Sequence, residues 1–108
     1  MTANPVLDLS LRRRIIDAIC SVYDPEIPVN IWELGLVYDI DIDDERRVHI
    51  RMTLTAPGGP SAQALPLEVE RKVREVSGVA DVYVEVVWEP AWSPERMSEA
   101  ARLQLGIL

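Results

Sequence analysis

The chain has 108 residues, 48% of them hydrophobic, which is enough for one domain with a single core but not for two. Its formal net charge of −7 argues against a general binder of nucleic acid or of anionic membranes, because both kinds of binder need a basic surface. A single cysteine, Cys20, excludes an internal disulfide, and no run of about 18 apolar residues predicts a membrane-spanning helix. We therefore expect a soluble, cytoplasmic protein with one domain over residues 1–108.

The first predicted helix begins near Asp8, a good N-cap residue, and ends near Tyr23. Residues 1–7 contain Pro5 and little periodicity, so we expect them to form a flexible lead-in. The helix should end before Pro25, because the residue preceding a proline is disfavoured in the α region. Its apolar stripe consists of Leu11, Ile15, Ile16, Ile19 and Val22.

Two features of this helix could carry chemistry. Cys20 lies beside the apolar stripe, and we expect a buried, inert thiol in preference to a metal ligand. The arginine run at residues 12–14 could contact phosphate, but a solvated helix face is the simpler interpretation.

The next segment, residues 24–30, contains two prolines and should form an ordered loop rich in oxygen ligands. Asp24 and Glu26 lie two positions apart, and Glu33 follows. These three carboxylates could hold a hard cation, or they could act only as turn and cap groups.

Two half-buried strands are predicted at residues 37–42 and 47–55, where apolar and polar residues alternate. On the first strand Tyr38, Ile40 and Ile42 share the apolar face. Pairing the strands as a hairpin with apolar residues opposed places Ile42 beside Val48, and this register requires a three-residue loop at residues 44–46.

The same register pairs charges across the polar face. Asp39 falls opposite Arg51, and Asp41 falls opposite His49. His49 is the only histidine, and we expect a half-exposed strand residue beside a carboxylate in preference to a ligand or proton shuttle.

The loop after the second strand, residues 53–61, is shaped by two proline–glycine pairs. Pro57 and Pro60 fix two φ angles, while Gly58 and Gly59 allow positive φ and close approach to bare backbone. Such a loop, placed before a helix, could bind an anion, a thiol or a metal-bound ligand, or it could simply be a tight connection.

A helix over residues 61–76 should follow, with Pro66 causing either a kinked first turn or a restart, and with Gly78 as the residue after its end. A third strand at residues 79–88 should run parallel to the second, because strand–helix–strand crossovers are right-handed. A last helix is predicted from an N-cap at Ser93 to about residue 105.

Two tryptophans, Trp88 and Trp92, flank the start of this last helix. They could pack on the core or form an interface, since tryptophan is enriched in both places.

The elements therefore predict an α+β fold, a small two-layer domain in the order α-β-β-α-β-α with a mixed three-stranded sheet packed with helices. The two loops that contain proline, residues 24–30 and 53–61, are the most constrained, and we predict a site between them. The order of the strands in the sheet is not determined by these patterns.

Four separated motifs identify a resemblance over nearly the whole chain. YDPEIPVNI at residues 23–31, ELGLVY at 33–38, MTLTAPG at 52–58 and VWEPAWSPERMS at 87–98 resemble the SufT-like metal–sulfur cluster assembly factors and the related PaaD proteins. The resemblance implies a small α/β domain that acts in the maturation of iron–sulfur proteins, by helping to deliver clusters or to recognise client proteins.

The resemblance also implies which residues form the binding site. The acidic motif of the family corresponds to Asp24 and Glu26, and its loop threonines correspond to Thr53 and Thr55. The family usually carries a cysteine where this chain has Gly59, so metal or cluster handling by that thiol does not carry over.

Counting ligands leads to the same interpretation. An iron–sulfur cluster normally takes four cysteine or histidine ligands, and one chain offers only Cys20 and His49. We expect no cofactor bound stably by the monomer, with iron or an iron–sulfur cluster held at most transiently; whether a metal site exists stays unknown.

We therefore hypothesise a non-catalytic maturation factor whose partners are iron–sulfur carrier or client proteins, with no nucleic-acid or membrane partner. The predicted binding surface consists of Asp24, Glu26, Thr53, Thr55, Pro57, Gly58, Gly59 and Pro60. One alternative is a structural module that forms a homodimer through Trp88, Trp92 and the last helix. The other is a small enzyme that uses Asp24 and Glu26 as acid and base.

Overall fold

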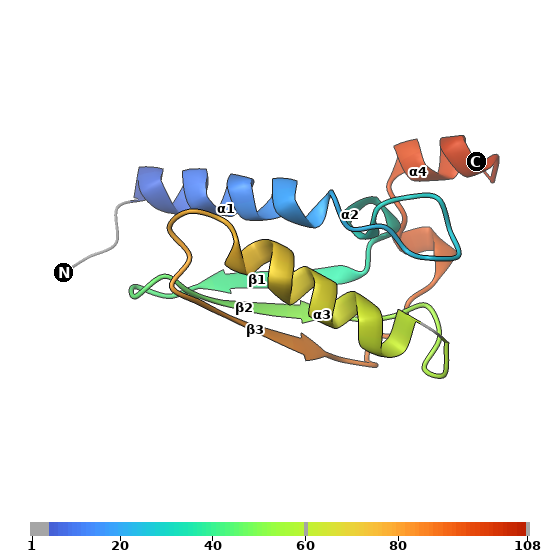
Figure 1. The fold of residues 1–108 in the computed structure, drawn as a ribbon. Coiled ribbons are helices and arrows are strands. Elements are labelled where there is room, and N and C mark those ends of the chain that lie inside the picture. Colours follow the sequence, from blue (N-terminus) through green and yellow to red (C-terminus); the bar gives the residue numbers. More distant parts are fainter. Residues whose placement is uncertain (1–4, 60, 108) are drawn as a thin grey trace.

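A three-stranded mixed sheet covered by two helices forms the centre of the computed structural model, which describes residues 5–59 and 61–107 (Figure 1). This arrangement confirms the predicted α+β fold with its three strands, and the structure adds two short elements, α2 and η1. The elements are α1 (Pro5–Ile19), α2 (Ile31–Leu34), β1 (Val37–Ile42), β2 (Arg47–Met52), α3 (Ser61–Arg74), β3 (Asp81–Val86), the 3₁₀ helix η1 (Pro94–Arg96) and α4 (Glu99–Leu105).

The strand order is β1-β2-β3, with β1 antiparallel to β2 and β3 parallel to β2 as predicted. The hairpin register is also the predicted one, with Ile42 beside Val48. Asp43 N donates to Arg47 O at 3.0 Å, and Arg46 has a φ of 62°. A three-residue loop that ends in a left-handed residue matches the twist of a hairpin, so the loop at residues 44–46 is confirmed.

A bulge interrupts this register at Tyr38. Val37 pairs with Met52, but Asp39 pairs with Arg51, so Tyr38 is an extra residue in β1. A bulge bends its strand and re-aims a side chain. The prediction that Tyr38 shares the buried face with Ile40 is therefore wrong, and Tyr38 is only half-buried.

Helices α1 and α3 lie together on one face of the sheet (Figure 1). Each helix buries one apolar stripe, and burial of such a side chain contributes about 1.5–3 kcal/mol. The buried residues of the helices and the sheet that meet in this core include Leu11, Ile15, Ile19, Leu65, Val69, Val73, Ile40, Val48, Ile50 and Met52.

Helix α1 differs from the prediction at both ends. It already includes Pro5, so the predicted N-cap at Asp8 is wrong; residues 1–4 of the expected lead-in lie outside the described residues. It ends at Ile19 because the backbone of residues 22–23 pairs with residues 30–31 instead of continuing the helix. Ile31 N donates to Val22 O at 2.9 Å, and Tyr23 forms a β-bridge with Asn30.

Helix α3 runs continuously from Ser61 through Pro66, so the second of the two predicted alternatives, a restart at Pro66, is wrong. It ends at Arg74, and Gly78, with a φ of 98°, lies in the turn that follows. Strands β2 and β3 are shorter than predicted and end at Met52 and Val86.

The single helix predicted after Ser93 is in fact two elements, η1 and α4. Ser98 separates them, because its backbone N donates to Glu33 O at 2.8 Å while its Oγ caps α4 by accepting from Ala101 N at 3.1 Å. The predicted end at about residue 105 is confirmed: α4 ends at Leu105, and Gly106 caps it with a left-handed φ of 75°. In the part of the chain that the structure describes, no helix is long and apolar enough to cross a membrane.

Candidate functional site

Asp24 holds the acidic loop in shape. Its side chain is 6% exposed, and its Oδ1 accepts hydrogen bonds from Glu26 N at 2.8 Å and Ile27 N at 3.2 Å. An aspartate that bonds to backbone two and three positions ahead makes a turn of its own. Asp24 therefore fixes the loop, and the turn leaves the Glu26 side chain exposed to solvent.

Glu33 points away from this pair. Its Oε1 accepts a hydrogen bond from Ser98 Oγ, while Asn30 caps α2 by accepting from Glu33 N at 2.9 Å. Within residues 5–59 and 61–107, no group of three or more histidine, cysteine, aspartate or glutamate side chains could hold a metal ion. The alternative that these carboxylates share a hard cation finds no support.

The second loop begins with an unusual buried hydroxyl. Thr53 N donates to Leu36 O at 2.8 Å, and the side chain is 1% exposed. Its Oγ1 has no hydrogen-bond partner among the described residues. An unpaired buried polar group costs about 1–3 kcal/mol of folding free energy. The buried Thr53 hydroxyl therefore does not stabilise the fold.

The rest of this loop is more accessible. Thr55 and Gly59 are half-buried, whereas Pro57 and Gly58 are exposed; Pro60 lies outside the described residues. A Cβ at Gly58 would meet no heavy atom within 4 Å, so packing does not require glycine there. The loop therefore presents an open backbone surface.

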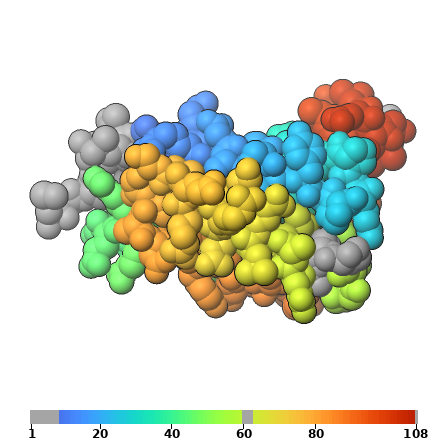
Figure 2. Space-filling view, viewed as in Figure 1, coloured from blue at the N-terminus to red at the C-terminus, as the bar shows by residue number. Residues whose placement is uncertain are grey.

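The two loops lie at the same end of the molecule, opposite the β1–β2 hairpin (Figure 1), and Figure 2 shows both at that end of the surface. Helix α4 flanks the acidic loop, since Gln104 Nε2 donates to Pro28 O at 3.3 Å. Among the described residues, no hydrogen bond or ion pair joins Asp24 or Glu26 to residues 53–59. The predicted site between the loops therefore stays a prediction.

Cys20 is half-buried just beyond α1. Burial raises the pKa of its thiol, and the negative charges of Glu33 and Asp17 raise this pKa further. A thiol that resists ionisation is a poor nucleophile and a poor metal ligand. These surroundings favour the inert interpretation of Cys20.

His49 lies beside a carboxylate, although not the expected one. Asp41 is its partner in the β1–β2 register, as predicted, but the His49 side chain turns to β3 instead, where its Nε2 is 2.9 Å from Glu85 Oε1. The Tyr83 ring lies 5.1 Å away, centroid to centroid. The parallel pairing of β2 with β3, which brings Glu85 close, supplies the partner.

The two tryptophans differ. Trp92 is half-buried against the core, and its Nε1 donates to Leu34 O at 2.7 Å, whereas Trp88 is 45% exposed. The core interpretation therefore holds for Trp92 and not for Trp88.

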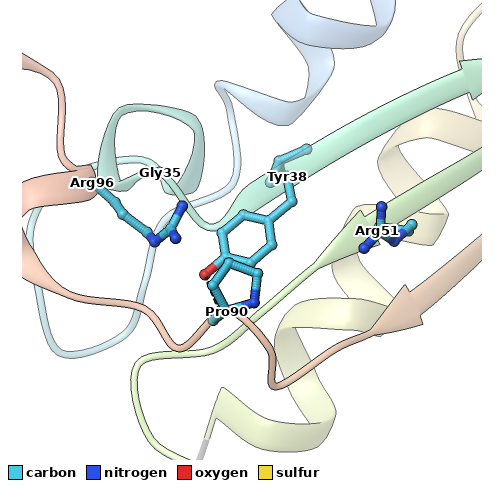
Figure 3. Close-up of a pocket in the computed structure, with 6 residues that line it drawn as sticks. Gly35, Tyr38, Arg51, Pro90 and Arg96 are labelled. Carbon is cyan, nitrogen blue, oxygen red and sulfur yellow. Dashed lines mark hydrogen bonds between the residues drawn. The ribbon is translucent and has the colours of Figure 1, made fainter.

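Sequence reasoning missed a cavity of about 440 Å³ on the side of the Tyr38 bulge (Figure 3). Its lining comes from α2's cap, β1, β2 and the segment before α4, so spacing along the chain carries no signal for it. The lining residues are Gly35, Val37, Tyr38, Arg51, Pro90 and Arg96.

Comparisons with known proteins agree with the motifs. The chain is 43% identical over 100 residues to an Fe-S protein maturation auxiliary factor of Porphyromonas gingivalis, covering 93% of this chain and 95% of the relative. It is 41% identical over 101 residues to an Fe-S protein maturation auxiliary factor of Bacillus subtilis, covering 94% and 99%.

A solved structure supports the fold. The crystal structure of a domain of unknown function, DUF59, from Bacillus anthracis superposes with a TM-score of 0.87 at 37% identity, covering 97% of this chain and 100% of that one. Residues 12–86 match the family described as iron-sulfur cluster assembly protein. The predicted SufT-like resemblance is thereby confirmed, and the chain belongs to the iron-sulfur cluster assembly protein family.

Proposed function

We propose that this protein is a non-catalytic auxiliary factor in the maturation of iron–sulfur proteins, which binds carrier or client proteins without holding a cluster of its own. Its family and the names of its relatives support the assembly role. The observation that carries the finer statement is the loop at residues 53–59, which offers Gly58 and Gly59 and no thiol beside the buried Thr53.

The binding surface in this proposal consists of the exposed Glu26 and the accessible residues of the second loop; Thr53 is buried at the start of that loop. Asp24 is buried and fixes the turn that exposes the Glu26 side chain, by accepting a hydrogen bond from Glu26 N. A half-buried thiol with a raised pKa at Cys20 adds no ready ligand, which favours a recognition role over cluster storage. Any iron or cluster passes through transiently, with the remaining ligands supplied by the partner.

The enzyme alternative is weaker because Asp24 is committed to two backbone hydrogen bonds while Glu26 is exposed to water. An acid–base pair needs two carboxyl groups that face one substrate.

The homodimer alternative keeps one specific support. Trp88 is 45% exposed, and Leu103 and Ile107 on and after α4 are 60% and 53% exposed. Sedimentation equilibrium over a concentration series tests it: a dimer that dissociates in Trp88→Ala supports this interface, and a concentration-independent monomer excludes it.

The experiment for the leading proposal measures binding of a purified iron–sulfur carrier protein to the immobilised chain, with and without added iron and sulfide. We expect binding without metal, and weaker binding by Glu26→Gln. Asp44→Asn is the matched control, because Asp44 is an exposed carboxylate on the hairpin at the opposite end (Figure 1). Complexes that form only after iron and sulfide are added would contradict the proposal.

A further inference from the structure

The cavity beside the Tyr38 bulge is lined by none of the residues of the proposed binding surface. It is an open pocket at the surface, with a volume of about 440 Å³, and volumes of this size are found in small-molecule sites. Figure 3 shows Tyr38 between two guanidinium groups, Arg96 on one side and Arg51 on the other, with Pro90 at its hydroxyl end.

Tyr38 forms a rigid wall of this cavity. The bulge in β1 turns it out of the core, and its hydroxyl donates to Pro90 O at 2.7 Å. The Arg96 guanidinium carbon lies 4.7 Å from the Tyr38 ring centroid. Stacking on an aromatic ring orients a guanidinium while leaving its outer edge free to bond.

Arg96 is held in position from its other side as well. Its Nε donates to Ala91 O at 3.3 Å, whereas its two terminal nitrogens have no hydrogen-bond partner among the described residues. Gly35 has a φ of 78°, and a Cβ there would lie 2.2 Å from Arg96 O. The glycine therefore allows the backbone of η1 to pack against the cap of α2 and fixes where Arg96 begins.

Arg51 is a half-buried cation without an ion pair. Its neighbours across the sheet are Asp39 on β1 and Glu85 on β3, but Glu85 bonds to His49 instead. In the part of the chain that the structure describes, no carboxylate oxygen lies within 4.0 Å of the Arg51 guanidinium. Neither Arg51 nor Arg96 forms an ion pair within 4.0 Å among the described residues, although the chain has a net charge of −7.

We propose that this cavity binds a small molecule through its oxyanion, a carboxylate or a phosphate, with Arg51 and Arg96 as the donors and Tyr38 as the wall. Guanidinium groups match the planar carboxylate and the phosphate with paired N–H donors. The proposed anion site does not depend on the assembly role, so each proposal can fail without the other.

Isothermal titration calorimetry with citrate and with inorganic phosphate, both at low ionic strength, tests the proposal. We expect one equivalent of at least one of these anions to bind, and Arg51→Gln to weaken it about tenfold or more. Binding of citrate alone assigns a carboxylate ligand, binding of phosphate alone assigns a phosphate ligand, and binding of both assigns a general oxyanion site.

Arg13→Gln is the matched control, because it removes the same charge from an exposed position on α1. Arg96→Gln should also weaken binding, but it removes the stack on Tyr38, so its fold is checked by circular dichroism. Arg51→Gln removes no bond in the described structure and keeps the test valid if Arg96→Gln unfolds. Equal weakening by Arg13→Gln and Arg51→Gln, or no binding of either anion to the parent chain, overturns the proposal.

Discussion

Ser98 joins the start of α4 to Glu33 in α2 through two hydrogen bonds, one from its Oγ to Glu33 Oε1 and one from its backbone N to Glu33 O at 2.8 Å. The two residues are 65 positions apart in the chain. The Glu33 carboxylate, which the sequence suggests as a metal ligand, therefore connects α2 to the start of α4. It also draws the C-terminal segment toward the end of the molecule that carries the acidic loop.

Gly35→Ala should destabilise the fold by about 2 kcal/mol or more, because alanine is strained at a φ of 78° and its Cβ would clash with Arg96 O. Urea unfolding followed by circular dichroism measures the free energy of unfolding. Gly58→Ala is the control and should change it by less than about 0.5 kcal/mol, since Gly58 has open space around it. Equal stability of both variants would refute the packing role of Gly35.

Thr53→Val should keep or raise the free energy of unfolding, by up to about 1 kcal/mol, because it replaces a buried hydroxyl that lacks a partner with an apolar group of the same shape. Thr55→Val, at a half-buried position in the same loop, is the comparison for stability. A clear loss of stability in Thr53→Val would mean that the hydroxyl has a structural partner.

Gly59→Cys should retain more iron than the parent chain after anaerobic reconstitution with iron and sulfide, because it adds one thiolate ligand to an accessible loop. A thiolate is the soft ligand that iron and iron–sulfur clusters prefer, and the resemblance to the SufT-like factors implies a cysteine at this position of the loop. Gly58→Cys, one position earlier, controls for a thiol placed anywhere in the loop. A chromophore in the parent chain would contradict the proposal that it holds no cluster of its own.

The stability of the fold should fall in acid partly through Asp43. Hydrogen bonds from Arg47, its backbone N–H first and its side chain next, lower the pKa of this carboxyl from its ordinary value of 3.8. A lowered pKa in the folded state gives stability that is present above the pKa of the unfolded state and is lost as the pH falls through the folded value. Urea midpoints measured from about pH 6 downward should therefore fall less steeply below about pH 4 in Asp43→Asn.

Asp44→Asn is the control for this pH series, because Asp44 is an exposed neighbour on the same hairpin. The difference between the variants should be small, since the Asp43–Arg47 pair is exposed to solvent and such pairs contribute little. Parallel curves for the parent chain and Asp43→Asn would show that this carboxyl does not couple to folding.

Much of the sheet follows from local pattern. The alternation along residues 37–42 and 47–52 opposes Ile42 to Val48, and only a three-residue loop satisfies that register. The crossover through α3 then makes β3 parallel to β2. These features are predictable because side-chain period and chirality act over a few residues and allow few solutions.

The candidate site is only partly predictable. The composition of the two loops marks them as constrained, and Asp24 acts in a turn as such loops suggest. The unpaired burial of Thr53 has no signal in the sequence, because it depends on packing around the end of β2. The cavity beside Tyr38 has no signal in the sequence either, because its two arginines come from elements far apart in the chain, β2 and η1.

The sequence by itself determined the two apolar helix stripes, the hairpin register and the family, because each is written in residue types at short, regular spacing or in motifs. Only the tertiary structure decided where α1 ends, why the chain breaks at Ser98 and where Tyr38 points. At Ser98 a hydrogen bond to the distant Glu33 interrupts the helix, and Tyr38, turned by the bulge, bonds to Pro90 across 52 positions. Local pattern sets which face of an element is buried, and long-range bonds set where that element stops.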